Sequence, residues 1–185
     1  VSGAAVSLKP LQVKNKLEDK KKNILSAAGL LVEGKSIAEQ FEQVTTRIVN
    51  LETGVYATDV ELSELAAAGY PLATFDQRRL AKDSGYSAKL SGKEDPASIK
   101  RLEKFAAVFL IEEDGALDKI ILPVHGYGLW STLYGFIALQ GDAETIAGLG
   151  FYSHTETPGL GGEVDNPSWK ALWVGKKIHD ASGSI

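Results

Sequence analysis

The sequence predicts an α+β domain, in which an antiparallel meander occupies the second half of the chain and helices pack around it. Paired apolar runs flank short turns there, a pattern typical of hairpins. The runs follow one another without the helices that a parallel sheet needs between its strands. The length of 185 residues fits one domain. We expect residues 1–30 to form a membrane-proximal helix leading from a missing membrane anchor, and residues 31–185 to form the domain proper.

The first segment is rich in lysine. Six lysines and two acids lie between Lys9 and Lys22, with leucines and isoleucines at helical spacing. The pattern predicts a helix with one modest apolar face, either solvated or close to a lipid surface. The chain contains no methionine, so we expect a processed or excised product. The small apolar residues 1–8 fit the end of a removed anchor or an added leader equally well.

The next elements are also expected to be mainly helical. A capping-box pattern predicts a short helix over 36–44. Alternation predicts an edge strand over 47–51. Asp59 is expected to cap a helix that reaches Ala68, and residues 94–104 are expected to be helical as well.

Four apolar runs then predict the meander. The runs 105–111 and 117–124 flank Asp114-Gly115, a hairpin signal. The runs 131–139 and 145–152 form the second pair.

Composition excludes several kinds of site. A net charge of −4 argues against nucleic acid as a partner. The absence of cysteine excludes disulfides, thiolate zinc sites, iron–sulfur clusters and a cysteine nucleophile. The chain has neither a dinucleotide-binding Gly-x-Gly-x-x-Gly between strand and helix nor a Walker A loop. Common nicotinamide and nucleoside triphosphate sites are therefore not expected.

Glycine is concentrated where the chemistry is expected. Residues 125–162 hold nine of the nineteen glycines, mostly in the segments 125–131 and 155–163. Pro158-Gly159 favours a type II turn. Gly161-Gly162 would leave backbone N–H groups open to a planar ring or an anion. The alternative is a purely structural turn.

Apolar side chains stand in the same two segments. Leu160 lies alone in its loop, and Trp130 with the nearby tyrosines could form another wall of the same pocket.

Other candidates are weaker. The three histidines lack metal-ligand spacing, and no hydrolytic or acyl-transfer machinery emerges. We expect neither a metal site nor catalytic side chains. Trp169 and Trp173 stand four apart on a helix begun by Asn166-Pro167, which predicts a core stripe.

The glycine-rich segments carry a family resemblance. Glu156-Thr157-Pro158-Gly159-Leu160-Gly161 resembles the signature of FMN-binding domains in two ion-pumping redox complexes. These are the sodium-translocating NADH:quinone reductase, through its NqrC subunit, and the Rnf complex, through its corresponding flavin subunit. Gly128-Leu129-Trp130-Ser131 and the run from Gly161 to Trp169 resemble the NqrC family more closely. The resemblance covers about residues 44–180.

This resemblance implies the function and its residues. It implies an FMN-binding electron-transfer subunit of a sodium-pumping NADH:ubiquinone oxidoreductase, working with the other subunits of a six-subunit pump. Glu156 is expected to orient the turn and Thr157 to donate a hydrogen bond to the flavin. The implied cofactor-binding residues are Glu156, Thr157, Pro158, Gly159, Leu160, Gly161, His125, Gly126, Gly128, Leu129 and Trp130.

The resemblance also implies a location and a tether. The family's soluble domain lies on the periplasmic side of the bacterial inner membrane, held by one N-terminal helix. Its flavin is joined through the phosphate to the threonine of a Ser-Gly-Ala-Thr motif. Here the one Ser-Gly-Ala run continues with Ala5, so we expect no covalent flavin. The alternatives are the Rnf-type flavin subunit, a stand-alone FMN-binding flavoprotein, or a periplasmic interaction domain without a flavin.

Overall fold

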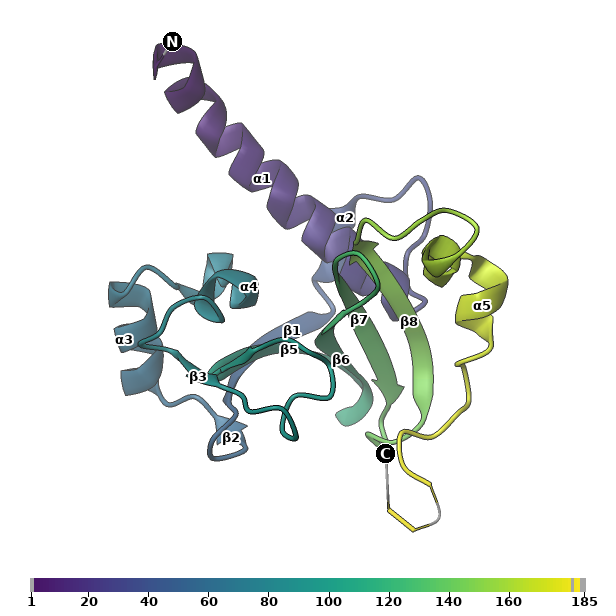
Figure 1. The fold of residues 1–185 in the computed structure, drawn as a ribbon. Helices are drawn as coiled ribbons and strands as arrows, with labels where there is room; N and C mark the ends of the chain where they lie inside the picture. Colours follow the sequence, from purple (N-terminus) through teal and green to yellow (C-terminus); the bar gives the residue numbers. More distant parts are fainter. Residues whose placement is uncertain (1, 181, 184–185) are drawn as a thin grey trace.

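The protein is built on one antiparallel sheet, as the sequence predicts (Figure 1). The structure is a computed structural model that describes residues 2–180 and 182–183, with side chains from residue 11 onward. The six strands lie in the order β2-β1-β5-β6-β7-β8, and β5 to β8 form the expected meander. Their bounds are β1 Val44–Asn50, β2 Val55–Tyr56, β5 Phe105–Glu113, β6 Ala116–Tyr127, β7 Thr132–Gln140 and β8 Ile146–Ser153.

Short helices surround this sheet, and α5 contacts β8 (Figure 1). A separate two-stranded sheet pairs β3 with β4. The bounds of the remaining elements are α1 Ser2–Ala27, α2 Ile37–Phe41, α3 Asp59–Ala67, η1 Leu72–Thr74, α4 Gln77–Leu80, β3 Ser87–Lys89, β4 Arg101–Glu103, η2 Gly161–Asp165 and α5 Pro167–Ala171.

The helix α1 lies within the predicted membrane-proximal segment 1–30, and of its side chains from residue 11 onward only those at its C-terminal end are buried. Ile24 and Leu25 are fully enclosed, whereas Leu11 and Val13 are exposed on the part that projects from the domain (Figure 1). At the buried end the Ala27 carbonyl lies directly against Gly148 of β8. Among the described residues, no helix combines the length and the apolar character that crossing a bilayer requires.

The core forms around β5 because its sequence is apolar without interruption. All residues from Phe105 to Ile111 are buried, as in a strand covered on both faces. Phe109 meets Phe136 and Phe41 edge-on, with ring centroids 6.0 and 6.5 Å apart. Burial of these large side chains supplies the main favourable term in folding.

The predicted helix over 94–104 is wrong. Ser98 and Lys100 have φ values of 53° and 68°, and residues 101–103 form strand β4. The carboxylate of Asp95 accepts the N–H groups of Ile99 and Lys100, each at 2.7 Å. These donors bond a side chain instead of helical carbonyls, so the segment folds into turns.

Three boundaries also differ from the prediction. Ser36 makes no capping hydrogen bond, and the short helix ends at Phe41, because Val44 already pairs with β5 in strand β1. Thr58 rather than Asp59 caps α3, through a reciprocal capping box with Glu61. The strand β1, predicted to lie at the edge of the sheet, is not the edge strand, because the two-residue β2 pairs with its outer side.

The turn between β7 and β8 is held by one carboxylate. Asp142 accepts hydrogen bonds from the Thr145 hydroxyl at 2.6 Å and from the Thr145 and Glu144 N–H groups at 2.8 and 2.9 Å. The Thr145 hydroxyl bond, followed by the backbone bonds, lowers the pKa of Asp142 from 3.8 to about 2.

Titration by carboxyl ¹³C NMR is expected to give Asp142 a pKa of about 2. Since this value is depressed, the stability that the carboxylate contributes is fully present above pH 3.8 and is lost as the pH falls towards 2. Thr145→Val removes the largest cause and should move the pKa back towards 3.8. An unchanged pKa in that variant would contradict the assignment.

Candidate functional site

The two glycine-rich segments lie at one end of the meander. The first, residues 128–131, joins β6 to β7, and the N–H of Gly128 donates to the Ser131 carbonyl at 2.8 Å. The second, residues 154–163, follows β8 and leads into η2. Because β8 pairs with β7, its C-terminal end carries the second segment back beside the first.

A buried carboxylate joins the two segments. Glu156 is 8% exposed, and its Oε1 accepts the N–H groups of Trp130 and Ser131, each at 3.1 Å. The hydroxyl of Ser131 accepts the N–H of Thr155 at 2.8 Å in the opposite direction. We refer to residues 128–131 and 154–163 together as the joined loops.

The charge of Glu156 is part of this joint. Backbone hydrogen bonds, led by that of Trp130, hold the pKa of Glu156 below its usual value, against the opposing effect of desolvation. Hydrogen bonds to an ionised acceptor are stronger than those between neutral groups. The carboxylate thus holds the two loops together.

Two glycines give the carboxylate its space. A Cβ on Gly128 would lie 2.6 Å from Glu156 Oε1 and 2.4 Å from Leu133 Cδ1. A Cβ on Gly161 would lie 2.8 Å from Glu156 Oε2. At both positions a Cβ would force the Glu156 side chain to shift, so glycine lets the carboxylate occupy this place.

The turn at Pro158-Gly159 has the predicted form, but one expected N–H group is occupied. Gly159 has a φ of 74°, and the Leu160 N–H donates to the Thr157 carbonyl at 3.1 Å. The N–H of Gly162 donates to the same carbonyl at 2.9 Å. The expectation that Gly162 leaves its N–H open is therefore wrong, because the loop itself uses that donor.

Three large apolar side chains stand out from the joined loops. Leu129, Trp130 and Leu160 are 74, 64 and 71% exposed. The Trp130 N–H is held by Glu156 and the Leu160 N–H by the Thr157 carbonyl, so these apolar side chains stand in water on hydrogen-bonded loops. A flat aromatic compound would remove this surface from solvent.

His154, Ser131 and Asp165 also support the loops, and sequence reasoning did not select them. His154 Nδ1 accepts the Glu156 N–H at 3.2 Å, so its Nε2 carries the proton that faces Asp165 Oδ2 at 2.9 Å. Their contacts cross turns and strand ends, and no local motif marks such contacts in advance.

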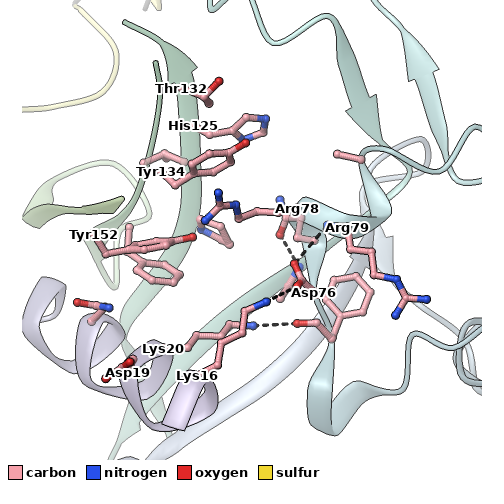
Figure 2. A pocket seen from close by; sticks show the side chains of 18 of the residues that line it. Lys16, Asp19, Lys20, Asp76, Arg78, Arg79, His125, Thr132, Tyr134 and Tyr152 are labelled. Atoms are coloured by element: carbon pink, nitrogen blue, oxygen red, sulfur yellow. Dashed lines mark hydrogen bonds and ion pairs between the residues drawn. The ribbon is translucent and has the colours of Figure 1, made fainter. Parts of the chain in front are cut away.

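Two of the expected site residues lie elsewhere. The ring of His125 stacks on Tyr134, with centroids 5.6 Å apart, and lines a cavity against α1 and α4 (Figure 2). A Cβ on Gly126 would face Ala97 at 3.6 Å. The structure brings Gly128, Leu129 and Trp130 to the residues 156–161 through Glu156, and it places His125 at a different surface.

The two tryptophans after η2 flank the sheet and do not form the predicted core stripe. Trp169 lies 6.5 Å from Phe151 and 5.6 Å from Trp173, measured between ring centroids, and both tryptophans are only partly buried. The helix α5 ends at Ala171, so Trp173 lies beyond it. Within the part of the chain that the structure describes, no three His, Asp or Glu side chains are grouped to hold a metal ion.

Comparison with known proteins gives one consistent result. The FMN-binding domain family matches residues 128–184, a span that includes the joined loops and excludes His125. The NqrC subunit of the Na(+)-translocating NADH-quinone reductase of Pseudomonas aeruginosa is 52% identical over 189 residues, which cover 100% of this chain and 69% of the relative. The same subunit of the Neisseria meningitidis serogroup B enzyme is 44% identical over 190 residues, which cover 100% of this chain and 68% of the relative.

Solved structures agree with the sequence relatives. The crystal structure of Shewanella oneidensis NqrC superposes with a TM-score of 0.77 and 34% identity, over 91% of this chain and 74% of that one. The corresponding subunit from Parabacteroides distasonis gives a TM-score of 0.69 and 26% identity, over 96% of this chain and 73% of that one.

Proposed function

This chain belongs to the NqrC family of the Na(+)-translocating NADH-quinone reductase, and we propose that it binds FMN and relays single electrons within that complex. The family assignment rests on 52% sequence identity over the whole chain. The assignment of FMN as the cofactor rests on the match of residues 128–184 to the FMN-binding domain family. The relatives compared above are NqrC proteins, so we set aside the Rnf-type and stand-alone alternatives.

The observation that carries the proposal is the apolar surface of the joined loops. Leu129, Trp130 and Leu160 are exposed on two loops that a buried carboxylate joins. These side chains suit the planar ring system of FMN, because they exclude water from the ring without a change of loop conformation.

The chemistry divides between the cofactor and the chain. FMN supplies the ability to accept and release electrons one at a time. Glu156 keeps the Trp130 loop closed, and the apolar side chains hold the ring against the protein. Thr157 is exposed, so its hydroxyl is accessible to a polar edge of the ring. His125 and Gly126 take no part in this assignment.

We further propose the finer placement of the domain. The soluble part lies on the periplasmic side of the inner membrane, and residues preceding α1 anchor it and bring it to the other subunits of the complex. The projecting part of α1 supports this arrangement, because it separates the joined loops from the N-terminal end (Figure 1).

Titration with FMN tests the proposal. Binding should quench the flavin fluorescence and saturate, and Trp130→Ala and Leu160→Ala should each weaken it about tenfold, since each removes a large side chain that the ring covers. Leu172→Ala is the matched control, because Leu172 is 64% exposed but lies outside the joined loops.

The same experiment tests the form of attachment. No threonine of this chain stands in a Ser-Gly-Ala-Thr motif, so acid denaturation should release all of the bound flavin. A lack of saturable FMN binding would instead favour an interaction domain without a flavin.

A further inference from the structure

A second cavity lies apart from the joined loops, on the face of the sheet towards α1 and α4 (Figure 2). Its volume is about 910 Å³, within the range of small-molecule sites. The floor comes from β6, β7 and β8, and the opposite walls come from α1 and residues 74–82. No residue between 153 and 163 lines it, so it is separate from the proposed flavin surface.

The cavity is cationic although the chain is acidic overall. Among the described residues that line it, eight are lysine or arginine and two are aspartate, against a net charge of −4 for the whole chain. One of the two acids is already engaged, because Asp76 pairs with Lys16 at 2.7 Å. A concave surface of one sign concentrates ions of the opposite sign, here anions.

Arg78 is a cation without an acidic partner. Its guanidinium carbon lies 3.5 Å from the ring centroid of Tyr134. The structure gives it no ion pair with any described carboxylate. Figure 2 shows it reaching into the space between the two tyrosines. The planar fork of a guanidinium matches phosphate and carboxylate groups.

Lys20 is a second cation of the cavity that makes no ion pair with a described carboxylate, although the charge of Asp76 attracts it from a greater distance. Its ammonium donates to the Phe75 carbonyl at 3.0 Å and lies 5.4 Å from the ring centroid of Phe109. Burial lowers the pKa of Lys20, because removal from water disfavours its charged form. An anion placed between Lys20 and Arg78 would stabilise the charged form of Lys20. By contrast, Arg79 turns away and donates to the Gly69 carbonyl.

The floor of the cavity is aromatic. His125 stacks with Tyr134, and Phe136 stacks with Tyr152 at 5.2 Å between centroids. These side chains stand on adjacent strands, so they form one continuous wall beside Arg78. An aromatic wall next to unpaired cations suits a ligand that has both a ring and an anionic group.

We propose that this cavity binds an aromatic phosphate monoester, with the phosphate at Arg78 and Lys20 and the ring against the Tyr134–Tyr152 wall. The ligand chemistry is that of an aryl or nucleoside monophosphate. The site is independent of the flavin assignment, since none of its residues belongs to the joined loops.

Phenyl phosphate is the probe for this site, with inorganic phosphate and phenol as the two partial ligands. Titration into the ¹⁵N-labelled chain should give saturable amide shifts around Arg78, Tyr134 and Tyr152. Phenyl phosphate should bind at least about tenfold more tightly than either partial ligand, because only it engages both features. Binding should weaken with added salt.

Variants localise the effect. Arg78→Gln should weaken phenyl phosphate binding about tenfold, whereas Arg78→Lys should retain part of it. Lys93→Gln, an exposed lysine outside the cavity, should bind like the parent protein. Trp130→Ala should also bind phenyl phosphate normally, which separates this result from the flavin test. The dispersion of the amide spectrum shows whether each variant is folded.

Three outcomes would show that no ligand binds at Arg78, and a fourth would exclude the proposed ligand class. The three are the absence of saturable shifts, equal affinity in a folded Arg78→Gln variant, and shifts that map to the joined loops. If inorganic phosphate alone bound as tightly as phenyl phosphate, the aromatic wall would have no role and the proposed ligand class would be wrong.

Discussion

Gly148→Ala is expected to destabilise the domain by about 3 kcal/mol, the upper end of the usual cost of overpacking. A Cβ at this position would lie 2.1 Å from the carbonyl oxygen of Ala27. That atom is backbone at the end of α1, and it cannot move alone because Leu25 and Ala28 beside it are buried. Either α1 leaves the sheet or β8 bends. Urea unfolding measures the loss as a lower midpoint with an unchanged slope.

Gly150→Ala is the matched control. Gly150 lies two residues further along β8, it has no positive φ, and nothing lies within 4 Å of a Cβ built on it. Its replacement should change the free energy of unfolding by less than about 0.5 kcal/mol. If the two alanine variants unfold at the same urea concentration, the contact between α1 and β8 is not as tight as the structure has it.

Glu156→Gln is expected to loosen the joined loops and to weaken FMN binding about tenfold or more, because hydrogen bonds to a charged acceptor become bonds to a neutral amide. The substitution keeps the size of the side chain, so it tests the charge rather than the packing. The amide hydrogens of Trp130 and Ser131, which donate to this carboxylate, should exchange with solvent at least about tenfold faster.

Glu163→Gln is the control in the same loop. Glu163 is exposed, and the hydrogen bond of its side chain is to Asn166 at 2.8 Å. This variant should leave amide exchange at Trp130 and FMN affinity unchanged. If Glu156→Gln behaves in the same way, the joint between the loops does not depend on the carboxylate.

A pH series gives a third test of Glu156. Its pKa in the folded protein is lowered from 4.5, so the contribution of the carboxylate is fully present above pH 4.5 and disappears as the pH falls through the lower, folded value. Corrected for intrinsic chemistry, exchange at Trp130 should therefore accelerate below pH 4.5 in the parent protein and stay nearly flat in Glu156→Gln.

The sequence predicts the meander because its signals are local. The run from Phe105 to Ile111 is apolar throughout and becomes the buried strand β5. Asp114-Gly115 marks a hairpin, and both residues have positive φ. The Pro158-Gly159 turn is equally local, since one proline and one glycine set its backbone angles.

The wrong predictions concern contacts between residues that are far apart in the sequence, or between a side chain and the backbone, which a local sequence pattern does not reveal. The helix expected over 94–104 is lost to the side chain of Asp95, which takes the N–H groups that the helix would need. Glu156 meets donors 25 and 26 residues away, so its role as a joint becomes visible only when β7 and β8 pair. His125 is near Gly128 in sequence, but the strand carries its ring to the cavity with Arg78.

The helix α1 has a mechanical consequence. From Ala27 back to Leu11 it is one uninterrupted helix, about 24 Å long at the usual rise per residue. A protein that binds the helix near Leu11 is therefore connected to the sheet by a rigid helix rather than by a flexible linker. The distance and the orientation between that protein and the sheet are then fixed. The C-terminal end of α1 packs against Gly148. A rotation of the helix at its N-terminal end is therefore transmitted to β8, the strand that leads into the loops around Glu156.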